Sequence, residues 1–416
     1  MRGTFRRILE LALARGFGTL VSLITLIFSA RYLGAEGRGI YVAAFTWMIT
    51  LCTLFHLSIG PALQYRIQKN KAAYETKSMM GSMLGLIGIL SIFAWTTALI
   101  AYLVTNGKIF GNLPAGALIL AFASLPLMMW EHYAPNIYTI LAKMHLINRA
   151  QYIGKLSGLL VFFILVVILK KGVYGALAAV FFSQLLTMLV SIVPLLRELK
   201  WKVMWLSNEV KPLLFSGLKI HVSSVTALLL DQASILIVNF YLTNEDLGYF
   251  QLAVQLVGLI LILPQSALVT LYGDMTKSNP SENWAHQKNV ITHIMLAVLA
   301  LSLVSAYLAP YLIPIVAGSQ FIPSVPIFIS LLPSLLGLSL SILLTPQWLG
   351  RGYFMLGNIF TSIALVFVVV GSVWMVPLYG IDGAIYIRVI VYGVLLPVAF
   401  IVFWTWCNKQ ATKDTS

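Results

Sequence analysis

Long apolar segments recur along the whole chain, and they constrain its fold more than any other feature of the sequence. Residues 79–104 and 357–376 are two examples, and each is long enough to cross the roughly 30 Å hydrocarbon core of a bilayer as a helix. Only 10% of the 416 residues are charged and 60% are hydrophobic, whereas soluble proteins carry about 25% charged residues. The sequence therefore predicts an all-α polytopic membrane protein. It excludes a soluble enzyme, a disordered chain and a secreted disulfide scaffold.

Breaks between the apolar runs predict twelve transmembrane helices. Each crossing needs roughly 20 mostly apolar residues. The first run contains Arg15 and is longer than the roughly 7–15 apolar residues of a signal peptide, so we expect it to be a retained span. The twelve runs are 8–33, 39–59, 79–104, 113–141, 152–169, 173–196, 213–242, 247–272, 290–316, 321–349, 355–376 and 381–407.

The distribution of Lys and Arg predicts the orientation, because basic loops stay on the cytoplasmic side. Alternate loops and both termini hold 19 basic residues, with Lys143, Arg149 and Lys155 assigned to the fourth loop, and the opposite loops hold 5. We therefore expect both termini in the cytoplasm. The net charge of +14 is then a topology signal, and no nucleic-acid partner is expected.

The two halves of the chain resemble each other at an offset of about 208 residues. This repeat predicts an N-terminal six-helix lobe (1–196), a cytoplasmic linker (197–212), a C-terminal six-helix lobe (213–408) and a cytoplasmic tail (409–416). The linker is either an interfacial helix or a solvated loop. Parallel repeats of this kind are typical of transporters. The matching residues are Leu33, Glu36, Gly39 and Ala44 with Leu242, Glu245, Gly248 and Ala253, Leu141 and Lys143 with Leu349 and Arg351, and Gly172, Gly175 and Ala176 with Gly380, Gly383 and Ala384.

Nothing in the sequence predicts catalysis, a metal or a cofactor. Cys52 and Cys407 lie far apart in apolar segments, and a metal or disulfide framework would need more cysteines at closer spacing. The longest breaks between apolar runs have 15 or 16 residues, too few for a catalytic domain. We therefore expect a protein that is not an enzyme.

Three segments resemble a known family of membrane proteins. Residues 30–45, ARYLGAEGRGIYVAAF, resemble the entry into the second span of polysaccharide exporters. Residues 229–256, LLDQASILIVNFYLTNEDLGYFQLAVQL, resemble their hairpin between spans seven and eight, and residues 343–358, LLTPQWLGRGYFMLGN, resemble the exit of span ten. Together they resemble Wzx-type flippases for O-antigen and capsule units, within the multidrug/oligosaccharidyl-lipid/polysaccharide (MOP) superfamily.

The resemblance implies a fold, a substrate and partners. The fold is a V-shaped, MATE-like pair of six-helix lobes around a cavity lined by spans one, two, seven and eight. The substrate is an oligosaccharide linked to polyprenyl pyrophosphate. It is flipped from the inner to the outer leaflet of a bacterial cytoplasmic (inner) membrane for lipopolysaccharide (O-antigen), capsule or exopolysaccharide assembly. Membrane lipid, a polysaccharide polymerase and a chain-length regulator are the implied partners, and no cofactor is implied.

Ionisable and polar residues inside spans are expensive to place there and are therefore functional candidates. Arg15, Thr19, Ser22 and Ser29 share one face of the first span, because helical neighbours recur every three to four residues. We expect Arg15 and Ser22 to bind substrate in a cavity. The alternative for Arg15 is that it reaches the nearby interface.

Two acids are candidates for binding a coupling ion. Asp231 lies deep in the seventh span, and Glu131 lies in the fourth span close to Pro135. A buried carboxyl group without a partner binds a proton more readily. A structural pair with a basic neighbour is the alternative for Asp231.

The remaining candidates for substrate binding are weaker. Lys219 and Arg388 lie near the ends of their spans and could instead reach the interface. Gln251 and Gln255 share a face of the eighth span and bond either sugar hydroxyls or another helix. His56 follows a threonine stripe in the second span and is either a packing residue or a cavity residue.

Two other functions compete with the flippase. A multidrug exporter of the same superfamily would favour an acidic, aromatic cavity for cationic drugs. Arg15 argues against this function, while Glu131 and Asp231 favour it. A membrane-embedded polysaccharide polymerase would need a large loop or an acidic metal–sugar motif, and we find neither in the sequence.

Overall fold

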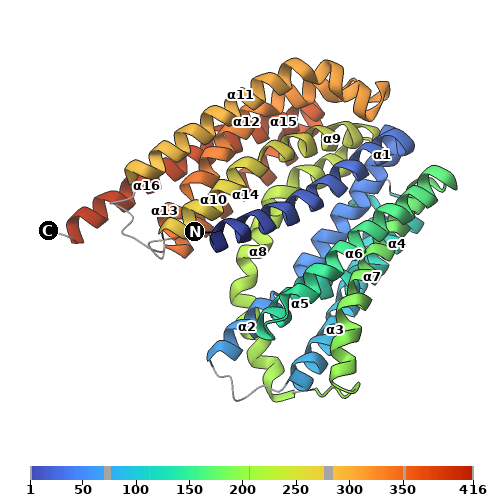
Figure 1. Cartoon of the computed structure of the whole chain (residues 1–416). Helices are drawn as coiled ribbons and strands as arrows, with labels where there is room; N and C mark the ends of the chain where they lie inside the picture. Colours follow the sequence, from blue (N-terminus) through green and yellow to red (C-terminus); the bar gives the residue numbers. More distant parts are fainter. Residues whose placement is uncertain are drawn as a thin grey trace. The chain divides into compact units, whose positions relative to one another are not determined.

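The computed structural model describes residues 2–69, 76–111, 113–205, 207–275, 284–349 and 353–414, with side chains near the N-terminus described at residue 18 and from residue 20 onward. These residues are almost entirely helical and form no β-strand (Figure 1). Within them, ten helices are long and apolar enough to cross a membrane, or eleven if one bent pair counts as a span. The predicted all-α membrane fold is confirmed.

The chain forms two compact units, Met1–Leu228 and Leu229–Ser416. The division falls inside α8, after the predicted linker, and the predicted lobe boundaries stay a prediction. The first unit contains α1 (Arg2–Phe55), α2 (Ile59–Lys69), α3 (Thr76–Thr105), η2 (Lys108–Phe110), α4 (Ala115–Ala123), α5 (Leu125–Ile140), α6 (Met144–Phe162), η3 (Phe163–Ile168), α7 (Gly172–Glu198) and the start of α8 (Ser207–Tyr241). The second contains the rest of α8, α9 (Asn244–Ile260), α10 (Ile262–Met275), α11 (Trp284–Ala317), η4 (Ser319–Phe321), α12 (Ser324–Leu344), α13 (Pro346–Leu349), α14 (Phe354–Tyr379), α15 (Ile381–Arg388), η5 (Val389–Leu395) and α16 (Leu396–Asp414).

The long helix α1 turns back on itself at Gly34, as Figure 1 shows. Gly34 has φ 72° and ψ −179°, a backbone conformation that glycine adopts without a steric penalty. Beyond the turn, the fully buried Arg38 donates to the Ser29 hydroxyl at 2.6 Å and to the Leu26 carbonyl at 3.3 Å. A straight helix would separate residues 26 and 38 by about 18 Å, so these bonds require the chain to reverse.

This reversal bears on the number of spans. The apolar segment Leu20–Gln68 is 49 residues long, more than twice the roughly 20 residues that one crossing needs. Another segment is the bent pair, in which α9 and the first part of α10 meet at an angle of 41°. Twelve crossings remain our prediction.

Residues 202–205 of the expected linker are not helical, and Met204 and Trp205 pack closely against glycines of α3.

Close packing of α6 on α7 positions the centre of the first unit. Two glycines of α6, Gly154 and Gly158, face Ser183 and Thr187 of α7 so closely that an added Cβ would overlap or crowd them. The Ser183 hydroxyl also donates to the Gly154 carbonyl at 2.9 Å. Small residues of this kind let membrane helices approach each other closely, where side-chain hydrogen bonds can join them.

The second unit is built around α12 and an apolar core. Gly337 of α12 lies against the backbone of Tyr392 and Gly393 in η5, which is a π-helical turn. Trp348 is 2% exposed and packs on Phe400 and Phe403, with ring centroids 4.5 and 5.3 Å apart.

Candidate functional site

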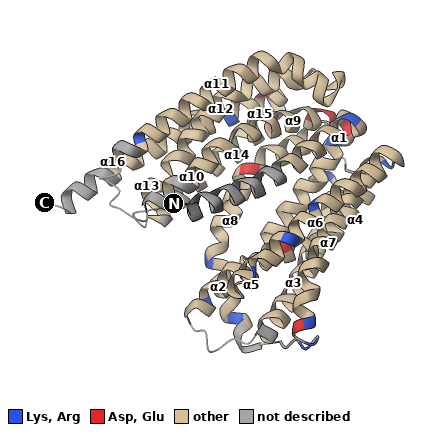
Figure 2. Cartoon of the chain, in the orientation of Figure 1, with Lys and Arg blue, Asp and Glu red and all other residues tan. Residues whose placement is uncertain are grey.

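The charged residues inside the first unit are few, as Figure 2 shows for the described helices. One acid, Glu131, lies on α5, and the fold fixes this helix firmly. Trp130 Nε1 donates to the Ser191 hydroxyl of α7 at 2.8 Å, and the Tyr138 hydroxyl donates to the Ser191 carbonyl. Both aromatic side chains are fully buried. The position of Glu131 is therefore set by aromatic neighbours on both sides of it along the helix.

Lys155 lies within electrostatic reach of Glu131, which also contacts the Thr187 side chain. Its ammonium group extends toward α1, because Lys155 Nζ would lie 3.1 Å from a Cβ added at Gly18. The lysine side chain is exposed on the surface of the described structure. This arrangement gives an acid and a base that face each other, with the base still open to a ligand.

The assignment of Lys155 and Arg149 to the fourth loop was wrong. Helix α6 begins at Met144, eight residues before the predicted start of the fifth span. Lys155 therefore lies near the middle of the candidate span Met144–Ile168. The sequence does carry a signal for this placement, since apolar residues both precede and follow Lys155. Lys143 does cap this helix, and it pairs with Glu198 at 2.6 Å.

The second unit places another cation in its interior. Arg388 is 8% exposed, and its guanidinium lies 5.0 Å from the ring centroid of Tyr392. Arg388 Nη1 has no hydrogen-bond partner among the described residues. The Tyr392 hydroxyl donates to the Leu230 carbonyl of α8. Arg388 does not extend to an interface, and it retains a donor with which to bind an anion.

Asp231 lies on α8, next to the residue that accepts the Tyr392 hydrogen bond. Its carboxylate is exposed on the described structure, and it accepts a hydrogen bond from Gln232 Nε2 at 2.6 Å. Electrostatic interactions link Tyr392 both to Asp231 and to Arg388. The acid and the cation of this unit thus share one aromatic neighbour.

The other predicted site residues are Arg15, Ser22, Lys219, Gln251 and Gln255. The side chain of Arg15 lies outside the described residues. Ser22 is exposed on α1, and Lys219 Nζ lies 4.7 Å from the ring centroid of Phe215. Gln251 and Gln255 are half-buried on α9, and both have interaction partners.

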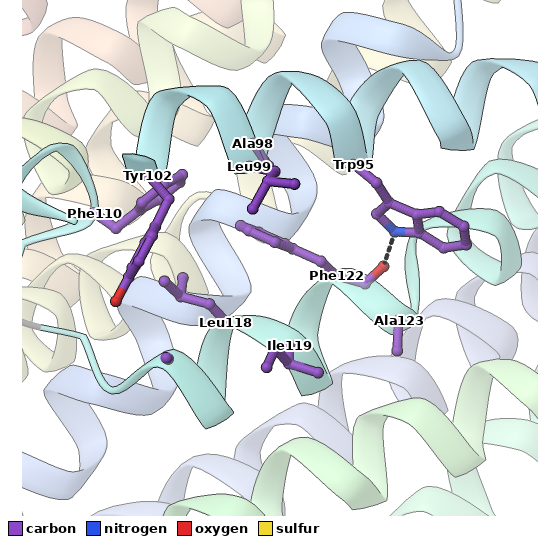
Figure 3. A pocket seen from close by; sticks show the side chains of 10 residues that line it. Trp95, Ala98, Leu99, Tyr102, Phe110, Leu118, Ile119, Phe122 and Ala123 are labelled. Carbon is purple, nitrogen blue, oxygen red and sulfur yellow. Dashed lines mark hydrogen bonds between the residues drawn. The ribbon is translucent and has the colours of Figure 1, made fainter. Parts of the chain in front are cut away.

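An apolar cavity of about 500 Å³ lies between α3 and α4 in the first unit. Figure 3 shows Tyr102 and Phe110 at one end and Trp95 at the other. Trp95 Nε1 donates to the Phe122 carbonyl at 2.7 Å, and this bond satisfies a carbonyl just before the break between α4 and α5. With the Trp95 N–H paired, the cavity offers a hydrocarbon chain a mostly apolar surface.

A smaller cavity of about 380 Å³ lies in the second unit at the start of α9. Asp246 and Asp382 line it, but the Asp246 carboxylate already accepts hydrogen bonds from the Thr243 backbone and hydroxyl. Across the described residues, no group of three or more His, Cys, Asp or Glu could hold a metal ion.

Known proteins with a similar sequence or structure indicate the family of this chain. No curated protein sequence matches the chain. The structure is similar to the lipid II flippase MurJ in an inward closed conformation, with a TM-score of 0.80 and 13% identity over 95% of this chain and 87% of that one. It is also similar to an inward-facing multidrug resistance MATE family transporter of the MOP superfamily (TM-score 0.71, 18% identity, 96% of each chain). A MOP superfamily transporter from Pyrococcus furiosus is similar as well (TM-score 0.64, 18% identity, 98% of this chain and 95% of that one).

These likenesses confirm the predicted MATE-like helical fold, and they show that MurJ has a similar fold. A family model supplies the more specific finding, because it matches residues 5–273, well over half of the chain. This protein belongs to the polysaccharide biosynthesis protein family.

Proposed function

We propose that this protein flips a polyprenyl-pyrophosphate-linked oligosaccharide across the bacterial inner membrane, from the inner to the outer leaflet. The product would feed the assembly of O-antigen, lipopolysaccharide, capsule or exopolysaccharide. The observation that carries the proposal is a mid-span cation, Lys155, in a chain of the polysaccharide biosynthesis protein family. A cation at membrane depth is expensive unless it has a function, and a pyrophosphate is the anion that such a lipid carries.

The roles of the residues follow from their chemistry. Lys155 and Arg388 each offer a positive charge inside a unit, and with Arg15 they would attract the pyrophosphate. Ser22, Gln251, Gln255 and Lys219 would bond sugar hydroxyls as the substrate passes. The apolar cavity between α3 and α4 would take part of the polyprenyl chain, because hydrocarbon gains free energy on dry apolar surface.

Transport needs alternating access rather than bond chemistry. A ligand changes the populations of two conformations only if it binds one of them better. Glu131 interacts electrostatically with Lys155, so a proton on Glu131 would remove the negative charge that competes with the substrate anion for the lysine. Asp231 would serve in the same way in the second unit. Both are therefore proposed as coupling sites, with both termini on the cytoplasmic side.

A clean deletion tests this function. Cells that lack the protein and any redundant transporter should accumulate the lipid-linked repeat unit on the inner leaflet and lose surface polysaccharide. A polysaccharide polymerase and a chain-length regulator would act on the flipped unit and are the proposed partners. Normal surface polysaccharide would contradict the proposal, and accumulation on the outer leaflet would point to a polymerase instead.

A cation-coupled multidrug exporter is the second candidate. The similarity to a MATE transporter over 96% of the chain favours it, as do the acids Glu131 and Asp231. An exporter should raise resistance to cationic drugs in a sensitive host and should not need Lys155. A flippase should leave drug resistance unchanged and fail without Lys155.

A further inference from the structure

A second break in the first unit separates α1, which ends at Phe55, from α2, which begins at Ile59. Two residues between them adopt positive φ angles, 48° at Leu57 and 47° at Ser58. Such a conformation is strained for residues other than glycine, and it persists only where neighbouring groups hold it. The break is therefore a point at which the chain can bend if those groups let go.

Side chains from two other helices satisfy the backbone of this break. The Leu54 carbonyl accepts a hydrogen bond from His221 Nε2 of α8 at 3.1 Å. The His56 carbonyl accepts one from the Tyr133 hydroxyl of α5 at 2.5 Å. The Ser58 N–H donates to Nδ1 of His56 at 2.9 Å. Three of the backbone groups that the break releases from helical bonding are thus paired with side chains.

Three histidines meet here, and we call them the histidine cluster: His56 from the break itself, His132 from α5 and His221 from α8. The rings of His56 and His132 stack with centroids 4.7 Å apart, and the ring of His221 meets His56 edge-on at 5.2 Å. His56 and His221 are 6% and 5% exposed, whereas His132 is exposed. In the stacked pair the ring faces are in contact, so the in-plane nitrogen lone pairs do not point at a common position. This arrangement does not favour a shared metal ion.

The titratable groups around His56 come from each element packed against it. Helix α5 contributes His132 and Tyr133, and α8 contributes His221. Within α1, Cys52 lies one turn earlier and its carbonyl accepts the His56 N–H at 2.8 Å. In α2, the first titratable side chain is that of Tyr65, six residues beyond the start of the helix. The acid nearest to this group is Glu131, which precedes His132 on α5 and interacts electrostatically with Cys52.

A proton has different consequences on the two buried histidines. Nδ1 of His56 accepts the Ser58 N–H, so a proton on that nitrogen removes the acceptor and leaves a buried N–H unpaired. Nδ1 of His221 lies 3.3 Å from the Ser58 hydroxyl, which lies 3.3 Å from the Ser224 hydroxyl. Hydroxyls can accept as well as donate, so a cationic His221 keeps its partners. Only His56 links a proton directly to the break.

We propose that the histidine cluster is a proton-binding site that controls the break between α1 and α2. A proton taken up on Nδ1 of His56 breaks the bond to the Ser58 N–H and opens the break. In the conformation seen here, burial and the accepted hydrogen bond keep His56 neutral, since a buried charge without a partner is costly. Protonation and opening therefore occur together. This inference goes beyond the flipping of lipid-linked sugars and does not depend on which substrate is carried.

Amide hydrogen exchange of the full chain in lipid nanodiscs tests the inference. Rates are measured between about pH 5 and pH 8, where histidine changes charge, and are corrected for the intrinsic pH dependence of exchange. A peptide that covers residues 56–60 should exchange on the order of tenfold faster at the acidic end, the factor expected for losing one hydrogen bond. Peptides from α3 should show no such change.

Two substitutions give the test its controls. In His56→Gln, the Gln carbonyl can accept the Ser58 N–H but cannot take up a proton, so the pH dependence should disappear. His293→Gln, at an exposed histidine of α11, should keep the wild-type response. A pH-independent wild type, or a His56→Gln protein that still opens in acid, would overturn the inference.

Nitrogen NMR of histidine-labelled wild-type protein covers the case in which His56→Gln does not fold. Replacing each of the other histidines by Gln, one at a time, assigns the His56 signal by elimination. Nδ1 of His56 should become protonated over the same pH range in which residues 56–60 open. If that nitrogen stays unprotonated while the segment opens, the proposal is wrong.

Discussion

Replacing Gly154 by Ala should destabilise the protein, because the added methyl group would crowd α7 where α6 packs against it. An added Cβ at Gly154 would overlap the Thr187 hydroxyl and lie 2.8 Å from the Ser183 carbonyl oxygen. Overpacking of this kind typically costs about 1–3 kcal/mol. The gain in helix propensity from Gly to Ala is at most about 1 kcal/mol. A net loss of about 1–2 kcal/mol follows.

The assay is thermal unfolding of the purified protein in detergent, together with export in a complemented deletion strain. A loss of about 1–2 kcal/mol should lower the midpoint by roughly 2–8 °C for a unit of this size. Gly88→Ala is the matched control, because a Cβ at Gly88 of α3 would meet nothing within 4 Å. Gly88→Ala should leave the midpoint unchanged or raise it slightly.

A double substitution separates packing from chemistry. Thr187→Ala removes the hydroxyl that the new Cβ would overlap, so the loss in Gly154→Ala/Thr187→Ala should be smaller than the sum of the two single losses. Contacting residues show such non-additivity, whereas distant ones add. Equal midpoints for Gly154→Ala and Gly88→Ala, or strict additivity in the double variant, would refute this account of the α6–α7 interface.

Three further substitutions test single residues. Lys155→Gln should abolish export at near-normal membrane abundance, while Lys155→Arg should retain part of it because the charge remains. Lys171→Gln, at an exposed lysine beside the start of α7, is the control. Full export by Lys155→Gln would exclude a substrate role for Lys155. Asp231→Asn should leave abundance unchanged, because the carboxylate is exposed and accepts its hydrogen bond from the adjacent residue Gln232. The variant should stop net transport, and a fully active variant would remove Asp231 from coupling. Arg38→Met should lower the free energy of unfolding by about 1.5–3 kcal/mol, the range for hydrogen bonds to a charged group. Thermal unfolding measures this loss, and an unchanged midpoint would show that the bonds across the Gly34 turn contribute nothing.

Much of the fold could be predicted from the sequence, because lipid demands long apolar helices and leaves few alternatives. The turn between the first two spans was visible at residues 34–38, although nothing in the sequence indicated that Arg38 is buried and bonded back to Ser29. Glu131 was identified as a candidate from its depth in a span. Its neighbour Lys155 was not, because basic residues near a span end were read as loop residues.

The histidine cluster could not be predicted in the same way. His56, His132 and His221 are separated by 76 and 89 residues in the chain, and only the packing of three helices brings them together. Single helices reveal which face a residue shares, but contacts between helices depend on crossing geometry that local patterns do not encode. The two residues with positive φ at the break are Leu57 and Ser58. Neither is a glycine, so the sequence gives no local indication of the break.

The flipping of a lipid-linked oligosaccharide in proteoliposomes tests the central claim most directly. The purified protein is reconstituted into vesicles that contain a polyprenyl-pyrophosphate oligosaccharide with a fluorescent sugar, and a membrane-impermeant reagent quenches the outer leaflet. The account predicts that wild-type protein makes nearly all of the label accessible, and that Lys155→Gln vesicles match protein-free ones. If wild-type vesicles lose only the outer-leaflet half of the signal, as protein-free vesicles do, the protein does not flip this lipid.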